Sequence, residues 1–150
     1  MPRRNPSVDH RPTGSPEPIH PNAGEQMRSD LRVQNRNANT LSEHGFNVHQ
    51  QPSGRSPQGH PVTADYEING KMFEHKVPHT TNARNFVDSQ LEKGASSFRS
   101  KGTQADRFVV DLGNGNISPE ALRAELLSRP NTGVQEVLVI KNGDVFPIFP

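Results

Sequence analysis

Three residues, Asp65, Glu74 and Lys76, have the types and spacing that metal-assisted chemistry requires. Between the two acids lies Asn69-Gly70, flanked by alternating residues, which is the strongest short-range signal of a β-hairpin with a type I′ turn. That turn fixes the register, so that Asp65 lies opposite Glu74, and directly paired residues share one face of the sheet. Lys76 follows two residues later on the same face. The hairpin therefore gathers two carboxylates and one amine on one surface.

Two carboxylates opposed across a ladder repel each other, which is destabilising. A divalent cation bound by Asp65 and Glu74 would convert this repulsion into coordination, because hard cations such as Mg²⁺ prefer carboxylate oxygens; Mn²⁺ and Zn²⁺ are alternatives. Lys76 could orient an attacking water, lower its pKa, or stabilise charge that develops on a phosphate. A solvated hairpin face, on which acids and lysines are ordinary, is the simpler interpretation of the same residues.

Four further polar residues are candidates for supporting roles. Glu67 shares the face of Asp65 and could bind a second metal ion or be solvated. Lys93 and Lys101 flank the end of the second predicted helix, where they could contact phosphate or be ordinary surface lysines. Gln104 precedes a buried strand and could position a substrate or a water, or simply lie at the strand edge.

The histidines offer a metal-free alternative, in which His75 and His79 cleave RNA through its 2′-hydroxyl by acid–base catalysis. However, the hairpin register places His75 on the apolar face, together with Tyr66 and Phe73. Pro78 also prevents a helix from bringing His79 to the same side. The sequence favours the acid pair over the histidines.

Hydrophobic periodicity predicts the elements that position these residues. The apolar face of the first helix is predicted to comprise Met27, Leu31, Ala38 and Leu41. The predicted elements are a helix at 25–44, a strand at 46–50, a loop at 51–63, a hairpin at 64–77, a helix at 82–98, a strand at 106–112, a helix from Ser118 to about 129, and strands at 134–141 and 144–149. The order α-β-ββ-α-β-α-ββ predicts an α/β fold with a mixed sheet flanked by helices, in two or three layers.

Composition sets limits on domain organisation. Only 29% of the 150 residues are hydrophobic, and 14 are proline. Residues 1–24 hold six of those prolines and few apolar side chains, so they cannot offset their backbone entropy by burial. We therefore expect a disordered linker at 1–24 and a folded domain at 25–150.

Composition and charge also exclude several classes of protein. The chain has no cysteine, which excludes a disulfide scaffold, a thiolate nucleophile and a Cys-based zinc site. No apolar run approaches the roughly 18–20 residues that span a membrane, so we expect no stable membrane association. The net charge of +1 excludes a polybasic arm that holds nucleic acid by bulk charge. Any function must therefore reside in a local site.

The motif Asp65…Glu74-His75-Lys76, on a hairpin between two helices, resembles the signature of the PD-(D/E)XK nuclease superfamily. Four segments, in their order and spacing, resemble more closely the C-terminal tRNase domains of contact-dependent growth inhibition (CdiA) toxins. They are LSEHGFNV at 41–48, ADYEINGKMFE at 64–74, QADRFVVDL at 104–112 and VLVIKNG at 137–143.

This resemblance implies a PD-(D/E)XK nuclease-like fold and a metal-dependent endoribonuclease that cuts tRNA in a target bacterial cell. Asp65 and Glu74 would bind the metal, and Lys76 would assist phosphodiester cleavage. Such folds carry an acid on the first helix, one turn before the position of Ala38. Here that position is Gln34, whose amide oxygen can meet a metal or its water without adding charge.

The resemblance further implies a cognate immunity protein as partner and delivery as the secreted or surface-displayed tail of a larger protein, acting in the target-cell cytoplasm. It leaves the oligomeric state open. Two other functions also remain open: a non-enzymatic protein-binding module, suggested by the near-neutral charge and the missing helix acid, and a DNA-cleaving nuclease of the same fold. A metal titration would separate the binding module from the nucleases.

Overall fold

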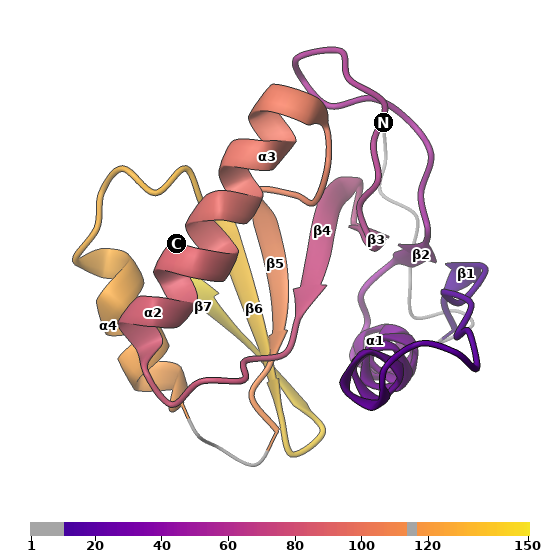
Figure 1. Ribbon diagram of the computed structural model, residues 1–150, viewed down its shortest axis with the longest axis horizontal. Helices are drawn as coiled ribbons and strands as arrows, with labels where there is room; N and C mark the ends of the chain where they lie inside the picture. Colours follow the sequence, from indigo (N-terminus) through magenta and orange to yellow (C-terminus); the bar gives the residue numbers. More distant parts are fainter. Residues whose placement is uncertain (1–10, 114–116) are drawn as a thin grey trace.

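The structure is a computed structural model that describes residues 11–113 and 117–150 (Figure 1). Its elements are β1 (Thr13–Gly14), α1 (Glu25–Glu43), β2 (Val48–Gln50), β3 (Tyr66–Ile68), β4 (Lys71–Lys76), α2 (Ala83–Phe86), η1 (Val87–Glu92), α3 (Lys93–Lys101), β5 (Arg107–Asp111), α4 (Pro119–Leu127), β6 (Glu136–Lys141) and β7 (Asp144–Phe149). The strands form one mixed sheet in chain order. Three pairs are parallel: β1 with β2, β4 with β5, and β5 with β6. The remaining pairs are antiparallel. In the described ranges, no helix is long and apolar enough to cross a membrane.

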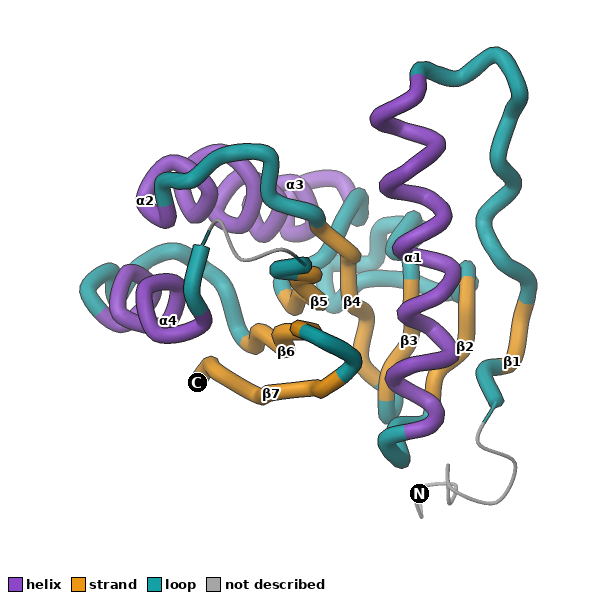
Figure 2. Tube along the Cα trace, turned by 90° about the horizontal axis from the view of Figure 1, so that it is seen from below, coloured by secondary structure: helices purple, strands orange, loops and turns teal. Residues whose placement is uncertain are grey.

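Helices cover both faces of the sheet, so the domain has three layers (Figure 2). On one face, α1 packs through Ala38 and Leu41 into a cluster that includes Val109. On the other face, α2, η1, α3 and α4 pack into a second cluster that includes Phe108 and Val110. Alternate residues of β5 thus serve opposite layers, as strand geometry requires. The predicted α/β class with a mixed, helix-flanked sheet is confirmed.

Local signals produced several of the observed boundaries. Both residues of the Asn69-Gly70 turn have positive φ, 50° and 85°, and the hairpin pairs Tyr66 with Phe73 as predicted. The last helix begins where Ser118 Oγ accepts a hydrogen bond of 3.0 Å from the backbone N–H of Ala121.

The expected linker at 1–24 falls partly outside the described residues. Within the described part, Thr13 pairs with His49 of β2, and the side-chain amide of Asn35 both accepts from the Glu17 N–H and donates to the Glu17 carbonyl, each at 3.0 Å. Backbone hydrogen bonds here replace the apolar contacts that the composition lacks. Residues 11–24 thus contact β2 and α1 through hydrogen bonds, while most of their side chains are exposed.

The predicted apolar face of α1 is wrong at its first position. Ala38 and Leu41 are fully buried, whereas Met27 is 60% exposed. The 19 residues of α1 extend about 28 Å, and the six residues of β4 only about 20 Å. The first turns of α1 therefore project beyond the sheet, and Met27 has no layer to pack against.

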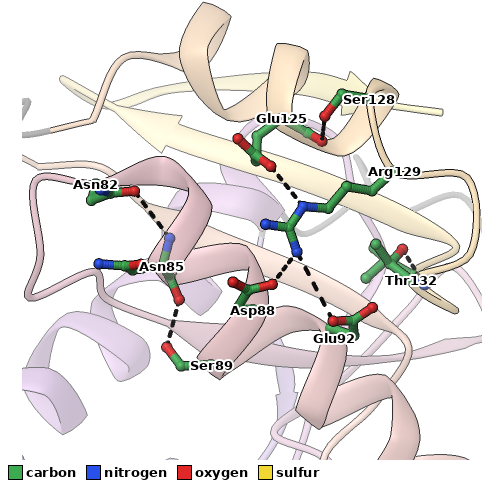
Figure 3. A network of polar contacts seen from close by, with 10 residues as sticks. Asn82, Asn85, Asp88, Ser89, Glu92, Glu125, Ser128, Arg129 and Thr132 are labelled. Atoms are coloured by element: carbon green, nitrogen blue, oxygen red, sulfur yellow. Dashed lines mark hydrogen bonds and ion pairs between the residues drawn. The ribbon is translucent and has the colours of Figure 1, made fainter.

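Polar contacts fix the α2–η1–α3 segment, which is continuous and contains a π-helical stretch, η1. Arg129, which follows α4, contacts Asp88 and Glu92 of η1, and its Nε lies 2.6 Å from Glu125 Oε2 of α4 (Figure 3). At the segment's start, Asn82 caps the first turn by accepting the N–H of Asn85. These contacts tie η1 to α4.

Candidate active site

The β3–β4 hairpin brings the two predicted acids together. β3 begins at Tyr66, so Asp65 lies one residue before the ladder. Asp65 Oδ2 accepts a hydrogen bond of 2.9 Å from the backbone N–H of His75. This bond holds the Asp65 carboxylate beside Glu74, the residue that precedes His75 in β4.

Burial disfavours the ionised forms of both acids, and the Asp65 carboxylate adds to this effect at Glu74. Burial raises the pKa of Glu74 well above its ordinary value, and the neighbouring Asp65 carboxylate raises it further. Burial also raises the pKa of Asp65, although the hydrogen bond from the His75 N–H opposes that shift. Glu74 Oε1 is buried and has no hydrogen-bond partner in the described part of the chain. The positive charge of Lys76 lowers the pKa of both acids but does not offset burial, so a bound cation would further favour their ionised forms.

The donor set of the acid pair fits Mg²⁺. Among the residues that the structure describes, no three or more His, Cys, Asp and Glu side chains form a group that could hold a metal ion. Protein sites for Zn²⁺ commonly use three or four such ligands, whereas Mg²⁺ keeps several waters and binds one or two carboxylates plus substrate phosphates. Asp65 and Glu74 supply two carboxylates, and the unpartnered oxygen of Glu74 is a free donor atom.

Lys76 is oriented by a residue from another loop. Its Nζ donates a hydrogen bond of 2.7 Å to Oε1 of Gln104, which lies between α3 and β5. Gln104 has φ 60°, and its Oε1 lies only 2.8 Å from where a Cβ on Gly94 would be. Gly94 therefore permits an approach that any larger residue would obstruct. The structure gives Gln104 a contact with Lys76, whereas the sequence suggested one with a substrate or a water.

A cleft of about 620 Å³ opens beside these residues at the end of β4. Glu74, Lys76 and Gln34 all line it, whereas Asp65 lies next to Glu74 outside the lining. Gln34 is buried, and its backbone carbonyl accepts a hydrogen bond from the hydroxyl of Tyr66. The structure therefore brings Gln34, Lys76 and Gln104 together with the acid pair.

Three other candidates lie outside this group. Glu67 is half-buried between His49 and Met72 in the ladder, and does not line the cleft. Lys93 is exposed and immediately precedes Gly94, which packs on Gln104. Lys101 is exposed at the other end of α3.

A buried polar network on the α1 side of the sheet was not predicted. Asn37 Nδ2 lies 2.7 Å from Asp111 Oδ2 and 3.0 Å from His75 Nε2, and Arg36 lies 3.6 Å from Asp111. Burial lowers the pKa of His75 to about 3, helped by the nearby charges of Arg36 and Lys76. A histidine so hard to protonate is poorly suited to acid–base catalysis. The position of Asn37 three residues after Gln34, on the same side of α1, is a signal that could have pointed to the network.

Similar proteins have been characterised. Residues 61–146 match the family model of the contact-dependent growth inhibition CdiA C-terminal domain. The tRNA nuclease CdiA-2 of Burkholderia pseudomallei (strain 1026b) is 33% identical over 147 residues, which make up 97% of this chain but 4% of that much longer protein. A chain of the CdiA-CT/CdiI toxin and immunity complex from Burkholderia pseudomallei matches with a TM-score of 0.78 and 32% identity, over 93% of this chain and 99% of that one.

The family match covers more than half of the chain and includes both acids, Lys76 and Gln104. The structural match extends the likeness to most of the described elements. This chain belongs to the contact-dependent growth inhibition CdiA C-terminal domain family.

Proposed function

We propose that this chain is a nuclease that cleaves tRNA. Asp65 and Glu74 would bind a divalent cation, preferably Mg²⁺, and Lys76 would act at the scissile phosphate. The observation that carries the proposal is the buried oxygen of Glu74, which has no hydrogen-bond partner among the described residues and belongs to a side chain that lines the same cleft as Lys76. The similarity to a protein named as a tRNA nuclease supports tRNA as the substrate.

A divalent cation bound here would polarise a phosphoryl oxygen and lower the pKa of a coordinated water. The chain's own residues hold and orient the reacting groups. The bond from the His75 N–H fixes the Asp65 carboxylate. Lys76 directs one of its three protons to Gln104 and keeps two for a phosphate oxygen, where its positive charge opposes the charge that develops on the phosphate. The amide of Gln34, on the α1 side of the cleft, would help to hold a water in place for attack on the phosphate.

The same family membership supports the partner and the route of delivery. The matching solved chain comes from a toxin and immunity complex, so the proposal includes a cognate immunity protein that covers the cleft. The relative named as a tRNA nuclease is far longer than this chain. The proposal therefore also includes delivery as the tail of a larger surface protein, followed by action on tRNA in the cytoplasm of a target bacterium.

The test is cleavage of total tRNA by the purified chain, with MgCl₂ or with EDTA. Asp65→Asn and Glu74→Gln should abolish cleavage, and Lys76→Met should lower kcat by about 100-fold or more. Glu43→Gln is the matched control, because it makes the same chemical change at an exposed residue at the end of α1.

Each alternative has its own outcome. Cleavage that survives EDTA, or full activity in both acid variants, would refute the proposed site. Cleavage of DNA but not of tRNA would establish the DNA nuclease. Neither cleavage nor stabilisation by Mg²⁺ or Mn²⁺ would point to a protein-binding module.

A further inference from the structure

The cleft at the end of β4 has room for more than a phosphate group. Its volume of about 620 Å³ lies within the range of roughly 300–1,000 Å³ that is typical of pockets for drug-sized ligands, and one nucleotide is of that size. Four segments line it: α1, the end of β4, the connection to α2, and the α2–η1 segment. The lining residues that the argument below uses are Gln26, Met27, Asp30, His79, Ser89 and Gln90.

The walls carry the chemistry that recognises a nucleobase. The side chains of Gln26, Gln34 and Gln90 each offer an amide donor and an amide acceptor, the pattern that reads base edges. Met27 adds an apolar surface that is 60% exposed although it lies in a helix. A thioether packs well against aromatic rings, so Met27 suits the face of a base. Gln26, Met27 and Gln90 have no role in the proposed metal site, so they are available to contact a base.

The wall formed by the α2–η1 segment contains a local distortion of the helix. Ser89 and Gln90 lie in the π-helical segment η1, and such segments are uncommon and often mark functional sites. Arg129 anchors this segment to α4 through Asp88, and Ser89 Oγ donates to the backbone carbonyl of Asn85 at 2.7 Å (Figure 3). Gln90 is left exposed on the cleft. The contacts of Asp88 and Ser89 hold the backbone that carries this amide.

A polar contact joins the two walls. His79 Nε2, from the connection between β4 and α2, lies 2.8 Å from Asp30 Oδ2 of α1. A cleft of this volume has room for one unstacked nucleotide but not for a paired helix of RNA.

We propose that this cleft binds a single unpaired nucleotide next to the scissile phosphate, with the base against Met27 and its edge read by Gln90. The inference rests on the proposed nuclease function and narrows its substrate to RNA that is unpaired, or can be unpaired, at the cut site. Extruding a base from a duplex costs a few kcal/mol, so an RNA that is already unpaired there should be cut faster.

The first experiment measures binding without cleavage. AMP, GMP, CMP and UMP are titrated into the full chain in EDTA, with the amide signals followed by NMR. We expect at least one nucleotide to shift signals from α1 and η1, and Gln90→Ala and Met27→Ala each to weaken that binding by about ten-fold. Gln58→Ala, an exposed glutamine of the 51–63 loop, is the matched control and should leave binding unchanged.

The second experiment uses cleavage. Once the cut site on tRNA is mapped, two RNAs present the same sequence, one with the nucleotide beside the cut unpaired and one with it fully paired. The unpaired RNA should be cut at least ten-fold faster by wild type, and Gln90→Ala should raise KM for it with little change in kcat.

The outcomes separate the cleft inference from the proposed function. Equal cutting of both RNAs, with Gln90→Ala unaffected, would overturn the nucleotide cleft while leaving the nuclease intact. Nucleotide binding that Gln90→Ala and Met27→Ala weaken, in a chain that cuts no RNA, would support the cleft and refute the nuclease. No binding of any of the four nucleotides at millimolar concentration would overturn the cleft.

Discussion

The acid pair should destabilise the metal-free domain. Glu74→Gln tests this directly, because it removes the charge of one acid and should therefore raise the stability. A buried acceptor without a partner costs about 1–3 kcal/mol. Two unit charges roughly 5 Å apart repel each other by about 3 kcal/mol at an effective dielectric constant of about 20. Protonation relieves part of this repulsion, because the pKa of Glu74 is raised by burial and by Asp65. We therefore expect Glu74→Gln to stabilise the metal-free protein by about 2 kcal/mol at neutral pH.

The pH dependence has a definite sign. A carboxyl whose pKa is raised by folding binds more protons in the folded state, so its ionisation destabilises the fold. Below the ordinary pKa of Glu74, 4.5, wild type and variant should have similar stability. The advantage of Glu74→Gln should grow as the pH rises above that value, until Glu74 is ionised in the folded protein.

Thermal unfolding followed by circular dichroism measures this effect. For a domain of this length, about 2 kcal/mol corresponds to a rise in Tm of about 4–8 °C. Added Mg²⁺ should raise the Tm of wild type but not of Glu74→Gln, since a ligand stabilises only the state that binds it. Glu43→Gln should stay within about 0.5 kcal/mol of wild type in both buffers. A lower Tm of Glu74→Gln in EDTA, or an equal Mg²⁺ effect on both proteins, would refute the reasoning.

Three further predictions concern residues around the site. Burial lowers the pKa of His75 to about 3 in the folded state, against 6.5 normally, so the contribution of neutral His75 to stability is complete above pH 6.5 and is lost as the pH falls. Between neutral pH and about pH 4, the free energy of unfolding of His75→Gln in EDTA should therefore fall by roughly 3 kcal/mol less than that of wild type. Parallel pH profiles of the two proteins would contradict this. Gly94→Ala should destabilise the folded domain by about 1–3 kcal/mol and lower kcat/KM, because the new Cβ would lie 2.8 Å from Gln104 Oε1 and displace the residue that orients Lys76. Unchanged stability and activity would count against that role of Gln104. Arg129→Ala should lower the Tm, by an amount that shrinks between about 0.05 and 0.5 M NaCl, since salt screens partly exposed ion pairs. A salt-independent loss would indicate packing instead.

The parts of the fold that the sequence predicted were those that short-range signals determine. The Asn69-Gly70 turn has one favoured geometry, so it fixed both the hairpin register and the shared face of the acids. Ser118 marked the start of α4 because a side-chain cap satisfies a backbone N–H locally. Such features need no knowledge of the rest of the chain.

The features that the sequence did not predict depend on contacts between distant segments. Gln104 reaches Lys76 across 28 positions, and only the absence of a side chain at Gly94 makes room for it. The residues next to Gln104 and Gly94 in the sequence form no pattern that predicts this contact. The exposure of Met27 likewise depends on how far α1 extends beyond the sheet, whereas periodicity reports only which residues share a face.

The location of the cleft follows from the topology of the sheet. α1 covers one face and α2 to α4 cover the other, so side chains from both layers can meet only where a strand between them ends (Figure 2). β4 is that strand: it pairs antiparallel with β3 and parallel with β5, and its carboxyl end is Lys76. Open α/β sheets commonly bind ligands at the carboxyl ends of strands where the topology changes. Glu74 lies two residues before that end, on the α2–α4 side, while Gln34 lines the same cleft from the α1 side. A substrate phosphate can therefore approach the buried acids from the end of the sheet without separating either helical layer from it.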